Sequence, residues 1–256
     1  MQGKVALVTG AGTGIGRGVA LALAARGVHV AINYHSSEEG ARTTLEQVQA
    51  QGVRGLLVRA DVSVAKQVRD MVDEVLQTFG RLDILVNNSA AQLNLGLADY
   101  DEAGYDRVMG VNLRGYFLCT QAAIAPMKRQ GGGRIVYISS VHGKRPTDFD
   151  VVYAITKGGI KMLARESAIE LGKYGITVNV IEPGAVHVGE KSGKPRPIVP
   201  AQAVSNESRR RGLRKFPLGR VGTPADIGHI VCFLADDASE FITGAAIRAD
   251  GGSMLL

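Results

Sequence analysis

The sequence is poor in cysteine and aromatic residues and contains no tryptophan. Only two of its 256 residues are cysteines, Cys119 and Cys232, and both lie in apolar stretches without the spacing of a metal site. We therefore expect two buried free thiols, no metal site and a reducing compartment, the cytoplasm. No apolar run approaches the roughly 18 residues of a membrane-spanning helix. Met1 to Lys4 leads straight into a predicted strand, so no signal peptide is expected.

Strong charge of one sign is also missing. The net charge of +6 is spread along the chain and accompanies no nucleic-acid-binding motif, so we expect no nucleic-acid partner. With 45% hydrophobic and 21% charged residues, the composition is that of a globular protein. Linkers, low-complexity tracts and internal repeats are absent from the sequence, which predicts a single domain over residues 1–256.

Apolar segments alternate with amphipathic ones from end to end. Near-continuous hydrophobicity in the first kind predicts strands buried on both faces of a parallel sheet. The predicted strands are Val5 to Val8, Val28 to Ile32, Gly55 to Val58, Ile84 to Val86, Ile135 to Ile138, Val178 to Ile181 and Ala246 to Ala249. The predicted helices are Ile15 to Ala25, Glu38 to Ala50, Val64 to Phe79, Asp106 to Lys128, Val152 to Leu171 and Ala225 to Leu234. This alternation predicts an α/β fold, a Rossmann-type doubly wound parallel sheet of about seven strands.

One long polar segment interrupts the alternation. Val186 to Lys215 contains three prolines and two basic clusters, and it follows a predicted strand. Ligands of such sheets bind outside the carboxyl ends of the strands, so we expect this segment to be a lid over the site. The alternative is an ordinary surface insertion.

A glycine-rich turn lies between the first strand and the first helix. Gly10, Gly12, Gly14 and Gly16 let the backbone turn tightly, and the N-terminus of the following helix presents N–H groups to phosphate. The turn therefore predicts a dinucleotide site.

The end of the second strand bears on the form of nicotinamide cofactor. A carboxylate there would accept from the ribose 2′-hydroxyl and repel a 2′-phosphate. The chain instead has Asn33-Tyr34-His35-Ser36-Ser37, although no basic residue stands there and Thr13 occupies the loop position where one would help. We expect NADP to be preferred and NAD to be tolerated.

A phenol, an amine and a hydroxyl are spaced for shared chemistry. Tyr153 and Lys157 lie one helical turn apart, and Ser140 ends a strand thirteen residues earlier. Such a group can pass a proton to or from a substrate oxygen. Ser139 competes with Ser140 for the hydroxyl role, and we prefer Ser140.

These motifs together resemble the short-chain dehydrogenase/reductase family over nearly the whole chain. The matching stretches are Thr9 to Gly16, Asp61-Val62, Asn87-Asn88, Asn112, Ser140, Tyr153 with Lys157, Pro183-Gly184 and Asp250-Gly251-Gly252. The resemblance implies a homotetramer and an NAD(P)-dependent oxidoreductase that interconverts a hydroxyl and a carbonyl group. It implies the catalytic residues Asn112, Ser140, Tyr153 and Lys157. The implied cofactor contacts are Gly10, Thr13, Gly14, Ile15, Gly16, Tyr34, His35, Ser36, Asp61, Val62, Asn88, Ser89, Ala90, Tyr153, Lys157, Pro183, Gly184, Val186 and Val188.

The resemblance also implies how these residues act. Lys157, with the oxidised nicotinamide, is expected to lower the pKa of Tyr153 and favour the phenolate. Asn112 is expected to hold a water that links Lys157 to solvent. Three positions depart from the family pattern: Ser89-Ala90 replaces Ala-Gly, Val188 replaces a threonine, and Glu182 precedes Pro183. We expect Glu182 to point to solvent.

The substrate prediction comes from local stretches of sequence. Stretches around Ser140, Lys157 and Pro183 look like those of bacterial glucose 1-dehydrogenases, which favours a sugar or polyol. Polar candidates for holding it are Gln92, Asn94, His142, Lys144, Asp148, Asp150 and His187. The alternatives are a 3-oxoacyl carrier-protein reductase, with the Arg209 to Arg211 run as a carrier contact, and a general carbonyl reductase. A module that senses dinucleotides without turnover is the non-enzyme alternative.

Overall fold

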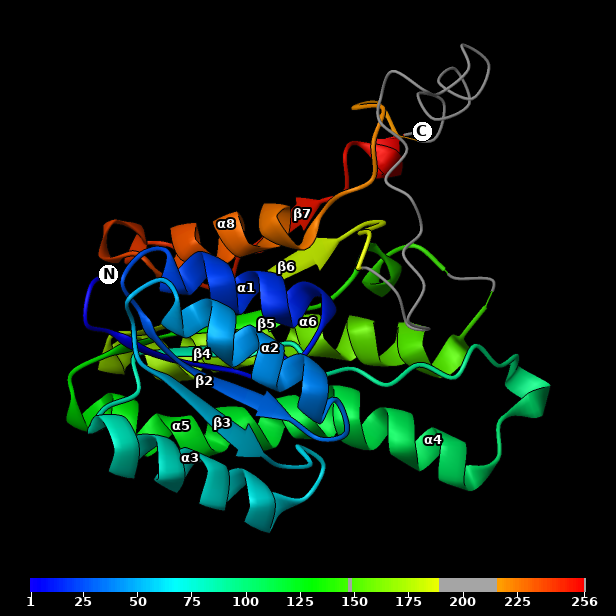
Figure 1. Ribbon diagram of the computed structural model, residues 1–256. Helices are drawn as coiled ribbons and strands as arrows, with labels where there is room; N and C mark the ends of the chain where they lie inside the picture. Colours follow the sequence, from blue (N-terminus) through cyan, green and yellow to red (C-terminus); the bar gives the residue numbers. More distant parts are fainter. Residues whose placement is uncertain (147–148, 189–215, 256) are drawn as a thin grey trace.

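The computed structural model describes residues 1–146, 149–188 and 216–255. Seven parallel strands form one sheet in the order β3-β2-β1-β4-β5-β6-β7 (Figure 1). Their bounds are β1 Val5–Val8, β2 His29–Tyr34, β3 Gly55–Arg59, β4 Ile84–Asn87, β5 Gly133–Ile138, β6 Ile176–Pro183 and β7 Ala246–Ala249. The predicted fold is therefore confirmed.

Helices cover both faces of the sheet (Figure 1). One layer holds α1 (Gly14–Ala24), α2 (Glu38–Gln49) and α8 (Pro224–Ala235), and the other holds α3 (Ala65–Phe79), α5 (Gly115–Arg129) and α6 (Val151–Leu171). Successive strand residues point to opposite faces, so Val5 and Leu7 join the core under α3, α5 and α6, whereas Ala6 and Val8 join the other core. Burial on both faces explains why the strand sequences are almost wholly apolar.

The predicted helix Asp106 to Lys128 is more complex than expected. It begins earlier as α4 (Glu102–Met109), capped by Asp101, and reaches α5 through the π-helical turn η2 (Gly110–Arg114). The described residues also contain five short 3₁₀ turns that were not predicted: η1 (Leu97–Asp99), η3 (Val141–Gly143), η4 (Gly172–Tyr174), η6 (Asp237–Ser239) and η7 (Ser253–Leu255).

The strand order reverses between β1 and β4. The loops after these two strands therefore diverge to opposite sides and leave a crevice at the carboxyl edge of the sheet. Thr9, after β1, and Asn88, after β4, face each other there: the Thr9 hydroxyl accepts from the Asn88 N–H at 2.9 Å. This crevice is where the predicted site residues should meet.

Other sequence-based predictions have mixed outcomes. Cys119 and Cys232 are buried free thiols, as expected. Most of the predicted lid, residues 189–215, lies outside the described residues, so the lid stays a prediction. The chain on its two sides is joined by a parallel bridge between Val186 and Gly222. No helix in the described parts of the chain has the length and hydropathy to cross a membrane.

Candidate active site

The glycine-rich turn forms one wall of the crevice. Helix α1 begins at Gly14, and among the described residues no side chain caps its first turn, so the N–H groups there face the crevice as an anion site would require. Gly16 has no room for a side chain: a Cβ atom would lie 2.4 Å from the Gly10 carbonyl oxygen. Asn88 holds the turn from the other side by donating to the carbonyl oxygens of Thr9 and Gly10 at 2.9 and 3.1 Å.

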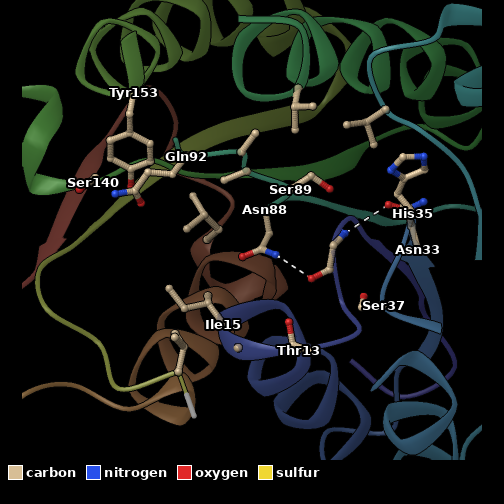
Figure 2. Close-up of a pocket in the computed structure, with 18 of the residues that line it drawn as sticks. Thr13, Ile15, Asn33, His35, Ser37, Asn88, Ser89, Gln92, Ser140 and Tyr153 are labelled. Carbon is tan, nitrogen blue, oxygen red and sulfur yellow. Dashed lines mark hydrogen bonds between the residues drawn. The ribbon is translucent and has the colours of Figure 1, made fainter. Parts of the chain in front are cut away.

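A cavity of about 840 Å³ opens along this wall. Its size is that of a pocket for a large organic ligand. Most of the predicted cofactor contacts line it: Gly10, Thr13, Gly14, Ile15, His35, Ser36, Asp61, Val62, Asn88, Ser89, Ala90, Tyr153, Lys157, Pro183, Gly184, Val186 and Val188. Figure 2 places Tyr153 and Ser140 at one end of the cavity, and Asn33, His35 and Ser37 at the other.

Two predicted contacts have other positions. The Tyr34 side chain is buried and packs in the core beside α1 and α2, because β2 directs it to the face opposite His35. The prediction that it contacts the cofactor is therefore wrong for its side chain. Gly16 does not line the cavity but allows the close approach of α1 to the turn.

The end of the cavity near β2 is polar and partly charged. His35 Nε2 lies 3.9 Å from Asp61 Oδ2, and the Ser63 hydroxyl donates to Asp61 Oδ1 at 2.7 Å. Burial alone would raise the pKa of Asp61, but the Ser63 hydrogen bonds, His35 and Arg107 together bring it below its usual value. Arg107, on α4, also lines the cavity; it lies in no motif, which is why the sequence did not reveal it.

The opposite end brings Tyr153, Ser140 and Lys157 together. Ser140 is the N-cap of η3, where its hydroxyl accepts from the His142 N–H at 3.2 Å, and it lies close enough to the Tyr153 phenol to lower the pKa of that phenol. Lys157 Nζ lies 5.3 Å from the centre of the Tyr153 ring and donates to the Ile138 carbonyl oxygen at 2.9 Å. Ser139 points elsewhere, because its hydroxyl donates to the Lys157 carbonyl oxygen at 2.7 Å. Of the two serines, only Ser140 therefore has its hydroxyl directed at the phenol.

Burial dominates the proton equilibria at this end. It lowers the pKa of Lys157 from 10.5 to about 7, since its ammonium is removed from water. It also raises the pKa of Tyr153, partly offset by the Ser140 hydrogen bond and reinforced by the Asp150 carboxylate. The expected lowering of the Tyr153 pKa is for Lys157 acting together with an oxidised nicotinamide, and it stays a prediction; burial of the phenol acts in the opposite direction.

The Asn112 side chain is held by hydrogen bonds within the protein. It is buried in the π-helical turn η2, and its amide exchanges hydrogen bonds with the backbone of Ala91 (2.7 and 2.9 Å) and donates to the Thr156 hydroxyl at 3.2 Å. Both amide hydrogens donate within the protein, so the side chain has none left for the expected water. π-Helical turns often occur at functional sites.

Glu182 is buried, and the expectation that it points to solvent is wrong. Alternation along β6 directs it to the same face as Val178 and Val180, toward α6. Two cations compensate its charge: Lys161 Nζ lies 2.6 Å from one oxygen and Lys144 Nζ lies 3.7 Å from the other. The sequence signal was present, because Lys161 follows Lys157 by one helical turn on the buried side of α6.

Three further residues of the cavity were not predicted as cofactor contacts. Asn33 accepts from the Gly10 N–H at 3.2 Å and donates to the Ala60 carbonyl oxygen at 3.1 Å, which ties the glycine turn to β2 and β3. Ser37 would meet a side chain at Gly12, since a Cβ atom there would lie within 2.4 Å of its hydroxyl oxygen. Gln92 lines the same cavity as Ser140 and Tyr153 (Figure 2).

The geometry fits a nicotinamide dinucleotide. A long cavity runs from an uncapped helix N-terminus, whose turn has no room for side chains, to a phenol paired with a hydroxyl and an amine. These are the groups needed to hold a diphosphate and to move a proton at a substrate oxygen.

Known proteins share this arrangement. Residues 10–254 match the family model described as enoyl-(acyl carrier protein) reductase. The chain is 40% identical over 249 residues to the 3-oxoacyl-(acyl-carrier-protein) reductase FabG of Staphylococcus aureus, which covers 97% of each chain. It is 39% identical to the hydroxynaphthalene reductase-like protein Arp2 of Metarhizium anisopliae, covering 99% of this chain and 96% of that one. The crystal structure of acetoin dehydrogenase from Enterobacter cloacae superposes with a TM-score of 0.86 at 35% identity, covering 98% of this chain and 96% of that one. With the fold, the site and these relatives in agreement, the chain belongs to the short-chain dehydrogenase/reductase family of oxidoreductases.

Proposed function

We propose that this oxidoreductase is an NADPH-preferring reductase of a ketone, with Tyr153 as the proton donor. The observation that carries the proposal is the meeting of Ser140 and Tyr153 at the end of the cavity opposite the β2 residues (Figure 2), with Lys157 beside the Tyr153 ring. A phenol that keeps its proton suits donation to a carbonyl oxygen, because burial raises the pKa of Tyr153. The nicotinamide cofactor, when bound, supplies the hydride.

Each residue has a distinct part in this proposal. Ser140 donates to the substrate oxygen and holds it against the phenol, and Tyr153 delivers the proton to that oxygen. Lys157 returns a proton toward Tyr153, which its pKa of about 7 permits near neutral pH. Asn112 is a positioning residue that joins the loop after β4 to α6 through Ala91 and Thr156.

The preference for NADPH rests on the end of β2. His35, Ser36 and Ser37 line the cavity there with hydrogen-bond donors, and β2 ends without a carboxylate. Asp61, the carboxylate that does line this end, is held by Ser63 and faces His35 at 3.9 Å. A ribose 2′-phosphate would therefore meet hydroxyl and imidazole donors, and NAD would still bind through the shared diphosphate site.

A 3-oxoacyl thioester is the first substrate candidate. The reductase FabG, named for that substrate class, aligns with almost the whole chain. A sugar has less support, because the polar groups expected to hold it are engaged: Asp150 accepts four hydrogen bonds, Lys144 faces Glu182, and Gln92 donates to Asn94 at 2.6 Å. Asp148 lies outside the described residues.

We also propose that the protein works as a homotetramer in the cytoplasm. Support for assembly comes from an apolar stripe on α6, where Ile155, Met162 and Ile169 recur every seven residues and are 50%, 54% and 78% exposed. Repeats of this kind are typical of helix faces that pack against a partner.

The decisive experiment measures NADPH and NADH oxidation with a 3-oxoacyl thioester, acetoin and an aromatic ketone, and NADP reduction with glucose. The proposal expects turnover of a ketone, with the highest kcat/KM for NADPH. Tyr153→Phe should remove turnover by at least about 10³-fold while NADPH still binds. Retained turnover in that variant, or activity on glucose alone, would overturn the proposal; binding without turnover on every compound would favour the dinucleotide-sensing module.

A further inference from the structure

Asp150 is a buried carboxylate, 2% exposed, that immediately precedes α6. It accepts four hydrogen bonds. Oδ1 accepts from the Tyr153 N–H at 2.9 Å and from the Tyr100 hydroxyl at 2.6 Å, and Oδ2 accepts from the N–H groups of Leu93 and Asn94 at 2.9 and 3.0 Å. A carboxylate has about four lone-pair sites, so Asp150 has none left for a substrate.

These bonds join two parts of the chain that are more than fifty residues apart. Tyr153 lies in the first turn of α6, whereas Leu93, Asn94 and Tyr100 belong to the loop between β4 and α4. Asn94 has a φ of 59°, and it is the one non-glycine residue with positive φ in the described parts of the chain. The two successive N–H groups of Leu93 and Asn94 both donate to one carboxylate oxygen, an arrangement that suits a negative charge.

The loop that Asp150 holds is a wall of the active site. Ala90, Ala91 and Gln92 line the cavity, as do Ser140 and Tyr153, and Figure 2 shows Gln92, Ser140 and Tyr153 in the same part of the view. Asn112 fixes Ala91 from one side, and Asp150 fixes Leu93 and Asn94 from the other. The position of Gln92 relative to the phenol therefore depends on the Asp150 contacts.

The charge of Asp150 also acts on the phenol. The groups that face Tyr153 are the Ser140 hydroxyl beside η3, Lys157 on its own helix, Tyr116 on α5 and the Asp150 carboxylate. Burial alone would raise the pKa of Asp150, but its hydrogen bonds from Tyr100, Tyr153, Asn94 and Leu93 lower it, so the group stays ionised near neutral pH. A fixed negative charge opposes loss of the Tyr153 proton.

We propose that Asp150 is a positioning residue for the reaction: it ties the loop that carries Gln92 to the turn that carries Tyr153, and so fixes this wall of the cavity relative to the phenol. This proposal rests on the proton-donor role of Tyr153 proposed above. It goes beyond that role because it gives Asp150 a part in fixing the geometry around the phenol.

The test is Asp150→Asn in the full-length protein. Asparagine caps a helix as well as aspartate does, so the Tyr153 N–H keeps an acceptor. The amide, however, brings hydrogens toward the N–H groups of Leu93 and Asn94, and it carries no charge. We expect kcat for ketone reduction to fall about 10-fold or more while the Kd for NADPH changes less than about twofold. In alcohol oxidation, the midpoint of the pH profile of kcat/KM should move to lower pH by roughly 0.5 to 1 unit.

Two matched variants separate position from charge. Asp101→Asn removes the charge from another helix cap, which accepts from the Gly104 N–H at 2.7 Å, and it should leave kcat and the pH midpoint unchanged. Tyr100→Phe removes one donor and keeps the carboxylate, so it should lower kcat without moving the midpoint. Asp150→Ser, which keeps a capping oxygen, repeats the test if the asparagine variant does not fold.

The outcomes distinguish this inference from the proposed function. If Asp150→Asn and Asp150→Ser fold with unchanged kcat and pH midpoint while Tyr153→Phe is inactive, Asp150 has no positioning role. If Asp101→Asn moves the midpoint of the pH profile as far as Asp150→Asn does, the shift is not specific to Asp150 and the inference also fails. If Tyr153→Phe remains active, the proton-donor assignment fails instead.

Discussion

Lys161 Nζ lies 2.6 Å from Oε1 of Glu182, and both side chains are buried, 10% and 1% exposed. Neither Glu182 oxygen has a hydrogen-bond partner of good angle within the described residues, so charge holds the pair together. The pair joins the end of β6, next to Pro183 and Gly184 in the cavity wall, to the helix that carries Tyr153 and Lys157.

Replacing Glu182 alone should destabilise the fold strongly. Glu182→Gln leaves the Lys161 charge buried without a partner, which costs about 3 kcal/mol of unfolding free energy. The double variant Glu182→Leu/Lys161→Met replaces both charges by apolar groups and should recover most of that loss. Urea unfolding measures both. The control Glu38→Gln breaks the exposed pair with Arg42 and should change stability by less than about 0.5 kcal/mol. A Glu182→Gln variant as stable as this control would contradict the prediction.

Gly16→Ala should weaken cofactor binding. Its Cβ atom would lie 2.4 Å from the Gly10 oxygen and 2.6 Å from the Asn88 amide nitrogen, so the glycine turn must move away from α1. We expect the Kd for NADPH, followed by fluorescence titration, to rise by about 10-fold or more, which is about 1.4 kcal/mol. Gly172→Ala is the matched control, because its Cβ atom meets nothing within 4 Å and its φ is −55°. Equal affinities for the two variants would show that the turn tolerates the methyl group.

Lys157→Met should make stability depend less on pH. Folding lowers the pKa of Lys157 from 10.5 to about 7, so the unfolded chain binds more protons between these values. The free energy of unfolding therefore rises with pH in this window, by roughly 1.4 kcal/mol per pH unit for this group. Below about pH 7 the buried amine is charged, and the full destabilisation by that charge is present. Lys157→Met has no charge to bury and therefore lacks this destabilisation.

The measurement compares urea unfolding of the two proteins without cofactor at pH 6, 7.5 and 9. Lys157→Met should be more stable at pH 6, and its advantage should shrink toward pH 9. Because all other groups titrate in both proteins, the difference isolates Lys157. An advantage that stays constant with pH would mean that Lys157 keeps an ordinary pKa in the folded protein.

Met162→Lys should change the oligomeric state. Met162 is the centre of the exposed stripe on α6, and a charge there would be buried in an interface built on that stripe. Sedimentation velocity should show a shift from a tetramer to smaller species. Leu97→Lys, at an apolar residue 80% exposed in η1, is the control and should leave the mass unchanged. An unaltered mass for Met162→Lys would place the contact on another face.

The strands were predictable because both their faces are buried. The bounds of β1 and β7 match the prediction, β2 begins one residue later and ends two residues later than predicted, and the other four strands are longer than predicted by one to four residues. Longer-range effects were not visible in local patterns. The π-helical turn around Asn112 depends on its bonds to Ala91 and Thr156, and the burial of Glu182 depends on a lysine 21 residues earlier. The spacing of Lys157 and Lys161 places Lys161 on the buried side of α6, but no local pattern pairs it with Glu182.

The motifs located most of the cavity but described its charges less well. Tyr153, Lys157 and Ser140 are together, as their spacing suggested, yet the direction of the Tyr153 pKa depends on burial and on Asp150. Arg107 reaches the cavity from α4 because of how that helix packs, which a single sequence does not reveal. The side of β2 on which Tyr34 lies likewise follows from the register of the whole sheet.

The bridge between Val186 and Gly222 has an evolutionary consequence. The His187 N–H donates to the Gly222 carbonyl oxygen at 2.8 Å, and the Gly222 N–H donates to the Ala185 carbonyl oxygen at 2.9 Å. The chain just before and just after residues 189–215 is therefore hydrogen-bonded together. Insertions or replacements between these two borders need not shift the strands on either side of the stretch. The length of this stretch can therefore differ between relatives while the sheet and the residues around Tyr153 keep their places.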